Sequence, residues 1–288
     1  MESYNLSIDL KRILESLEES VLEFSESTEI SRPTLISILE NKREVSKDTI
    51  EKIYSYAYAN RLNLNRNKEL IYLDDVKGRK LLFHGAQGGI EGKVDTLHSV
   101  PPNDFGNGFY TGESLKQAAS WVAKGEDSSV YCFYLEGIES LRIKKLISNM
   151  DWLFAVLYYR GAFKSFEIPE NILSLINEIE ESDLIIAPIA DNEMFKTIDS
   201  FARNEITDEA CMHAISATNL GFQYVFKSQT ACDHLSFVDR LYLCKKEKED
   251  YILEKNNLSN EGILKSRFAL NEYRREGRFF DEIFQRKR

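Results

Sequence analysis

The chain has 288 residues, of which 43% are hydrophobic and 29% are charged, a composition that excludes a disordered or fibrous protein. Its net charge of −10 would repel a phosphate backbone at long range, so any contact with nucleic acid has to be local. Because no apolar run of about 18 residues and no signal-peptide pattern occur, we expect a cytoplasmic protein without a membrane partner.

The first part of the chain, residues 1–60, predicts a small all-helical domain, because helix-forming residues dominate and no strand-like alternation occurs. Near its end, Ser46 is expected to cap a helix that continues through Ile53. A helix at the beginning of this domain is indicated by apolar residues that recur at helical spacing, namely Leu10, Ile13, Leu14 and Leu17.

Two short helices joined by a turn are predicted in the middle of this domain. The first helix covers residues 21–27, the turn residues 28–31, and the second helix residues 32–40. Pro33 falls in the first turn of the second helix, where a missing N–H costs nothing. The sequence from residue 24 to residue 53 resembles the helix-turn-helix of the Cro and phage-repressor family.

This resemblance implies that the second helix enters the major groove of DNA. Against it, residues 1–60 carry 7 Lys and Arg and 12 Asp and Glu, a net charge of −5 that is unusual for a DNA-binding surface. DNA binding, protein docking and a scaffolding role therefore all stay open for this domain. The candidate base or phosphate contacts are Ser31, Arg32, Thr34, Leu35 and Ser37.

Beyond residue 60 the pattern changes. Residues 61–77 are polar and Asn-rich and predict a linker, whereas residues 78–244 alternate short β-rich runs with helical ones. Residues 245–288 predict a charged helical C-terminal extension with 12 Lys and Arg against 9 Asp and Glu. The expected fold class is therefore α+β. Strands are expected at residues 80–85, 129–136, 184–191 and 222–228, and helices at residues 114–123, 151–159 and 207–218.

Three segments of the second domain carry polar or glycine residues that a plain core strand would not need. The first is the apolar strand that ends in His84 and Gly85, where missing side chains let a ligand lie close to the main chain. The second runs from Asp104 to Tyr110, with two alternating glycines before an aromatic pair. The third places the amide of Gln223 at the start of an aromatic strand.

Taken together, these motifs resemble the bacterial DUF3990-type family of the ADP-ribosyltransferase superfamily, over residues 78–240. The resemblance implies a split β-sheet domain that binds NAD as a co-substrate. In the branch with a His-Tyr-acid triad, the histidine binds the adenosine ribose, the tyrosine stacks on nicotinamide, and the third residue orients the nicotinamide ribose. Here these catalytic roles would fall on His84, Tyr110 and Gln223, and Gly85 would bind the nicotinamide amide. The resemblance adds the cofactor-binding candidates Asp104, Gly108, Phe109, Arg160 and Asp191.

The chemistry that this resemblance implies passes through an oxocarbenium-like state, so a polar group must face the developing positive charge. Since Gln223 cannot act as a base, we expect the transfer of a single ADP-ribose to a protein, RNA or DNA acceptor. A toxin-like or defence-related mono-ADP-ribosyltransferase would have an antitoxin protein as a further partner. The alternative is a DNA-binding regulator whose C-terminal domain senses NAD without turning it over.

The four cysteines form no C-x-x-C pair and are expected to be reduced thiols. Two C-x-H pairs, Cys211 with His213 and Cys232 with His234, offer residue types that bind zinc. The first pair lies on a predicted helix, where positions i and i+2 point apart. We therefore expect no metal.

Overall fold

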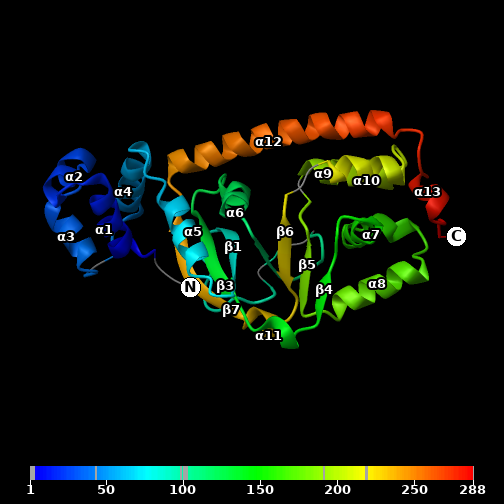
Figure 1. Cartoon of the computed structure of the whole chain (residues 1–288), viewed down its shortest axis with the longest axis horizontal. Helices are drawn as coiled ribbons and strands as arrows, with labels where there is room; N and C mark the ends of the chain where they lie inside the picture. The colour runs from blue at the N-terminus through cyan, green and yellow to red at the C-terminus, as the bar shows by residue number, and fades with distance from the viewer. Residues whose placement is uncertain are drawn as a thin grey trace. The chain divides into compact units, whose positions relative to one another are not determined.

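The computed structural model describes residues 4–42, 44–97, 99, 103–190, 192–217 and 220–287 (Figure 1). The chain divides into two compact units. Unit 1 comprises residues 1–93, 114–136 and 236–254, and unit 2 comprises residues 94–113, 137–235 and 255–288.

Three of the described N-terminal helices of unit 1, α2, α3 and α4, begin at serine caps, of which the sequence predicts Ser46. The side chains of Ser20, Ser31 and Ser46 each accept a hydrogen bond from the backbone N–H three residues later. The helices predicted at residues 21–27 and 32–40 are confirmed, whereas their action as a DNA-binding motif stays a prediction. The bounds are α1 (Leu6–Leu17), α2 (Val21–Thr28), α3 (Arg32–Leu39), α4 (Lys47–Ala59) and α5 (Leu64–Asp74).

Helix α5 occupies most of the segment that the sequence predicts as a linker. It packs through polar side chains: the Nζ atom of Lys68 lies 2.6 Å from a carboxylate oxygen of Asp9 and 2.8 Å from one of Asp239. All three side chains are almost fully buried. Residues 61–77 are therefore polar because this helix buries polar side chains, and not because the segment is a linker throughout. The domain boundaries themselves stay predictions.

The strands of unit 1 confirm those predicted from apolar runs at residues 80–85 and 129–136. Strand β1 (Lys80–Gln87) pairs antiparallel with β3 (Ser128–Leu135), and β3 is followed in the strand order by β7 (Leu235–Tyr242). Helix α6 (Leu115–Val122) shares a buried apolar core with β1 and β3. The sequence predicts this helix as well, but not β7, in which the adjacent charged residues Asp239 and Arg240 interrupt the apolar run.

Unit 2 contains four strands in the order β4-β5-β6-β2. Strand β6 pairs antiparallel with both β5 and β2, whereas β4 pairs parallel with β5. The α+β class is therefore confirmed at the level of a mixed sheet with helices. The bounds are β2 (Phe109–Gly112), β4 (Ile143–Lys145), β5 (Leu184–Pro188) and β6 (Phe222–Phe226).

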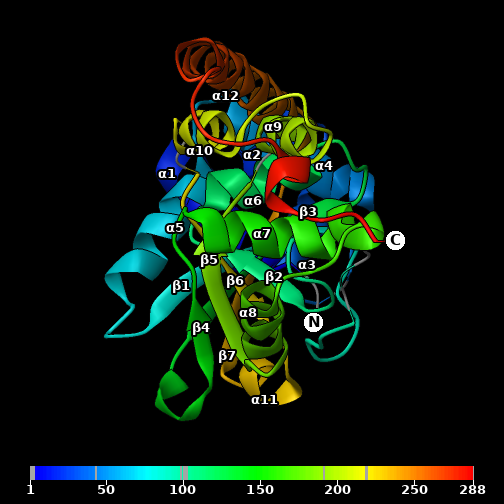
Figure 2. The same ribbon diagram turned by 90° about the vertical axis from the view of Figure 1, so that its right-hand side faces the viewer.

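The helices of unit 2 enclose an apolar core around Trp152. Helix α7 lies between α8 and α9, and α10 lies beside α9 (Figure 2). The helices predicted at residues 151–159 and 207–218 correspond to α7 and α10. The bounds are η1 (Ile138–Ser140), α7 (Met150–Tyr159), η2 (Ala162–Ser165), α8 (Glu170–Glu180), α9 (Asn192–Ala202), α10 (Asp208–Ser216), α11 (Gln229–Cys232) and α13 (Phe280–Ile283).

The predicted C-terminal extension is helical. Helix α12 (Lys245–Glu272) has 28 residues. Most of its described side chains are exposed or half-buried, which accounts for its mixed charge pattern. Of the helices in the described part of the chain, none combines the length and the apolar character needed to cross a membrane.

Candidate functional site

Asp104 lies at the centre of a buried polar cluster in unit 2. Its Oδ1 atom accepts a hydrogen bond from Nη2 of Arg160 at 3.1 Å, and its Oδ2 atom accepts one from Nε2 of Gln223 at 3.0 Å. These partners are 56 and 119 positions away along the chain. The fold thus joins three residues that the sequence assigns to one site, which we call the Asp104 cluster.

Strand pairing fixes the place of Gln223. It lies in β6 opposite Ala187 of β5 and Gly112 of β2, and only 7% of its surface is exposed. Its Nε2 atom also donates to the backbone oxygen of Pro188 at 3.0 Å. Because both partners of Nε2 are acceptors, the NH₂ end of the amide must face them.

The backbone oxygen of Pro188 has a second donor. Nε1 of the buried Trp152, on α7, donates to it at 3.2 Å. A proline carbonyl at the end of a strand accepts hydrogen bonds as any other does, although its nitrogen cannot donate. This contact anchors α7, and with it Arg160 at the C-cap of that helix, to the end of β5 where Gln223 is held.

The loop before β2 owes its glycines to two different constraints. Gly106 has a φ angle of +72°, a conformation that favours glycine. Gly108 instead lies against β6: a Cβ atom there would be 2.8 Å from a side-chain carbon of Val225 and 3.0 Å from the backbone oxygen of Phe226. Glycine at position 108 therefore lets the start of β2 approach β6 closely.

Tyr110 closes this loop. Its hydroxyl donates to the backbone oxygen of Gly106 at 2.7 Å and accepts the backbone N–H of Phe105 at 3.2 Å. Burial raises the pKa of Tyr110 well above its usual value, so the side chain is a neutral phenol at physiological pH.

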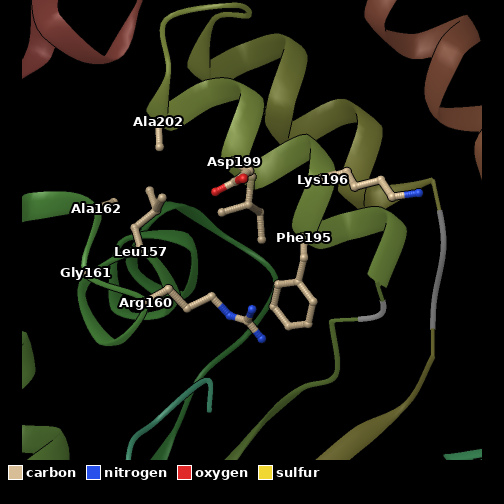
Figure 3. Close-up of a pocket in the computed structure, with 9 residues that line it drawn as sticks. Leu157, Arg160, Gly161, Ala162, Phe195, Lys196, Asp199 and Ala202 are labelled. Atoms are coloured by element: carbon tan, nitrogen blue, oxygen red, sulfur yellow. The ribbon is translucent and has the colours of Figure 1, made fainter. Parts of the chain in front are cut away.

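Arg160 borders a cavity of about 380 Å³ between α7 and α9. Its Cζ atom lies 3.2 Å from the ring centroid of Phe195, a cation–π contact. Figure 3 shows the two side chains next to each other, with Lys196 directed away from them and Asp199 one turn further along α9. The Arg160 side chain keeps 30% of its surface exposed, so part of the guanidinium is accessible.

Opposing effects act on the charge of Asp104. Burial raises its pKa, whereas the hydrogen bond from Gln223 and the positive charge of Arg160 lower it. Burial is the largest of these effects, so the pKa lies above its ordinary value. A buried carboxylate with one cation and one neutral donor can both attract a positive charge and accept a proton.

His84 and Gly85 lie in β1 of unit 1, where His84 is half-buried and pairs with Tyr131 of β3. A Cβ atom at position 85 would lie 2.4 Å from the backbone oxygen of Ala118 in α6. The packing of α6 on β1 therefore accounts for this glycine. The ligand contacts that the sequence assigns to His84 and Gly85 stay predictions.

The remaining predicted residues are dispersed. Phe109 is fully buried against Phe226, with ring centroids 6.4 Å apart, and its cofactor contact stays a prediction. Asp191 lies outside the described residues. On α3, Arg32 is exposed and Thr34 and Ser37 are half-buried. Leu35, by contrast, is fully buried in the core of the N-terminal helices, so the prediction that it contacts DNA is wrong.

Sequence reasoning missed two parts of this site. Phe195 gave no signal, since an aromatic residue on an amphipathic helix is usually a core residue. The carbonyl of Pro188 gave none either, because a backbone atom has no letter in the sequence. Across the described ranges, no group of His, Cys, Asp and Glu side chains suited to a metal ion is found. All four cysteines are buried free thiols.

Comparison with known proteins identifies a family for this chain. A family model described as a protein of unknown function, DUF3990, matches residues 81–237, more than half of the chain. No curated protein and no solved structure matches significantly. The matched range includes the whole Asp104 cluster as well as His84 and Tyr110.

Proposed function

Because the chain belongs to the DUF3990 family, we propose that it is an NAD-dependent mono-ADP-ribosyltransferase with the split β-sheet of the ADP-ribosyltransferase superfamily. The observation that carries the proposal is the Asp104 cluster. Asp104, Arg160 and Gln223 are all assigned to NAD binding or catalysis by the resemblance, and they form one hydrogen-bonded set.

The side chains of unit 2 fit the chemical groups of NAD. Arg160 presents a partly exposed guanidinium, the side chain best suited to a pyrophosphate, beside a cavity within the usual size range of ligand pockets, roughly 300 to 1,000 Å³. Tyr110 offers an aromatic ring for nicotinamide, and Gln223 an oriented amide for the ribose hydroxyls. For His84 and Gly85, which belong to unit 1, the resemblance implies binding of the adenosine ribose and of the nicotinamide amide.

Transfer requires that the bond between ribose C1′ and the nicotinamide nitrogen break, with its electron pair leaving on neutral nicotinamide. A nucleophile of the acceptor then bonds to C1′ and loses a proton. Burial of the Asp104 cluster favours this step, because charges and dipoles act more strongly where water is excluded. The acceptor is a protein, RNA or DNA, and a single ADP-ribose is transferred.

The test is incubation with NAD labelled on the adenylate, separately with cell protein, RNA, DNA or buffer alone. Wild type is compared with His84→Ala and with His213→Ala, a control histidine on α10 that stacks on Tyr273 away from the Asp104 cluster. We expect label in one acceptor pool with wild type and His213→Ala only. Free ADP-ribose in buffer alone would identify a glycohydrolase, and equal transfer by His84→Ala would refute the assignment.

A second candidate is a DNA-binding regulator whose C-terminal domain senses NAD without turnover. The observation that favours it is the amide at position 223, where an acid would stabilise the transition state better. In that case α3 would contact DNA through Arg32, Thr34 and Ser37. Measurable NAD affinity with no nicotinamide release, together with sequence-dependent DNA retention, would select this function.

If the transferase is toxin-like, an antitoxin protein would block its cleft. Expression of the intact chain alone would then arrest a bacterial host, and His84→Ala would relieve the arrest. Equal toxicity of both forms would exclude an effect that depends on transfer.

A further inference from the structure

We propose that Asp104 supplies the carboxylate for ADP-ribose transfer, and that Gln223 is the residue that positions it. This inference rests on the proposed function and deepens it, because it replaces the acid that the third motif lacks. The acceptor's proton moves to Asp104 as the acceptor's nucleophile bonds to C1′, and from Asp104 it passes to solvent. No further reactant is needed.

The contacts of Asp104 leave it able to act on a ligand. Among the residues that the structure describes, each carboxylate oxygen accepts one hydrogen bond, from Arg160 or from Gln223, whereas an ionised carboxylate has about four acceptor positions. The Asp104 side chain keeps 10% of its surface exposed. Held from two sides, it has a fixed direction and needs no rearrangement when charge develops nearby.

The same geometry explains why position 223 is an amide. Nε2 of Gln223 lies 3.0 Å from Oδ2 of Asp104, so a glutamate there would bring two carboxylates to about this distance. Like charges so close cannot both ionise, and one would be held protonated. A fold that has its acid at position 104 therefore needs a neutral donor at position 223.

Arg160 completes the arrangement. Its positive charge balances Asp104 and stabilises the ionised form in a buried site. Burial nevertheless raises the pKa of Asp104 above that of an exposed aspartate. Asp104 is therefore a stronger base than an exposed aspartate.

The experiment measures nicotinamide release in single turnovers and NAD affinity by calorimetry, with the full chain. Asp104→Asn should lower the rate by roughly 10² to 10⁴, the usual contribution of a general base, and change the NAD Kd by less than about threefold. The matched control is Glu113→Gln, which removes a partly buried carboxylate directly after β2, one bonded by the hydroxyl of Tyr224 at 2.8 Å. Its rate should equal that of wild type.

A second variant, in which the acid and the amide exchange positions, keeps the test decisive if the single variant misfolds. Asp104→Asn combined with Gln223→Glu keeps one acid, one amide and the hydrogen bond between them, with its direction reversed. The rate of nicotinamide release by this double variant should exceed that of Asp104→Asn by roughly tenfold or more. Failure to regain rate in a folded double variant would overturn the role of Asp104.

Other outcomes separate the two proposals. Unchanged release by Asp104→Asn, or a loss of NAD affinity that accounts for its lower rate, would overturn the role of Asp104 and leave the transferase intact. Wild type that releases no nicotinamide would overturn the transferase and this inference together.

Discussion

Replacement of Glu247 by Gln should remove a pH dependence of folding that is built into unit 1. Glu247 lies in the first turn of α12 and is 8% exposed. Both of its carboxylate oxygens lie within 3.1 Å of Nδ2 of Asn65 on α5. The Oδ1 atom of Asn65 is buried and lacks a hydrogen-bond partner among the described residues. A protonated Glu247, or a glutamine, could donate to that oxygen.

Burial, only partly offset by the hydrogen bonds from Asn65 and Tyr251, raises the pKa of Glu247 from 4.5 to about 7. A raised pKa in the folded state means that the stabilisation is fully present below pH 4.5 and is lost as the pH rises through about 7. Between pH 5 and pH 8 this shift corresponds to a loss of roughly 2 to 3 kcal/mol in the free energy of unfolding.

Urea denaturation of wild type and Glu247→Gln at pH 5 and pH 8 measures this contribution. The loss from pH 5 to pH 8 should be smaller by roughly 2 to 3 kcal/mol in Glu247→Gln, with unchanged m values. Glu249→Gln, an exposed neighbour on the same helix, is the control and should behave as wild type. An equal loss in Glu247→Gln and wild type would show that Glu247 is ionised in the folded protein throughout this range.

Further substitutions test the site and the buried ion cluster. Gly108→Ala places a methyl group against Val225 and should cost about 1 to 3 kcal/mol in denaturant unfolding, so an unchanged midpoint would disprove the close approach. Lys68→Met leaves two buried carboxylates without their cation and should cost about 3 to 5 kcal/mol, and an unchanged free energy of unfolding would show that this ion cluster does not stabilise the fold. Arg160→Lys keeps the charge but loses the planar contact with Phe195, and should raise the NAD Kd about tenfold in calorimetry. An unchanged Kd would show that Arg160 is not part of the proposed NAD site.

The pattern of apolar residues in the sequence predicts many of the helices and strands whose buried side chains are apolar. Strands β1, β3, β5 and β6 are short apolar runs, and α7 and α10 carry helical patterns. Helix α5 and strand β7, which pack through polar groups, were missed, and helices α8 and α9 were missed although their buried residues are apolar. Helix α5 and strand β7 meet through Lys68 and Asp239, and a buried ion pair has the same composition as a solvated surface.

The candidate site was predictable residue by residue but not as a contact network. The motifs indicated Asp104, Arg160 and Gln223 separately, yet nothing in their spacing brings together side chains 119 positions apart. The pairing depends on the register of β6 between β5 and β2, which a single sequence does not contain. Phe195 and the Pro188 carbonyl joined the site only through the packing of α7 and α9.

The Asp104 cluster also changes what the amide in the third motif implies. Taken alone, Gln223 counts against catalysis, because an amide neither carries charge nor accepts a proton. Beside a buried carboxylate at 3.0 Å, the same amide is the neutral neighbour that lets the acid ionise. Whether a chain of this family can transfer ADP-ribose should then depend on positions 104 and 223 jointly. An amide at 223 with no acid at 104 predicts a binding domain, and one acid between the two positions predicts an enzyme.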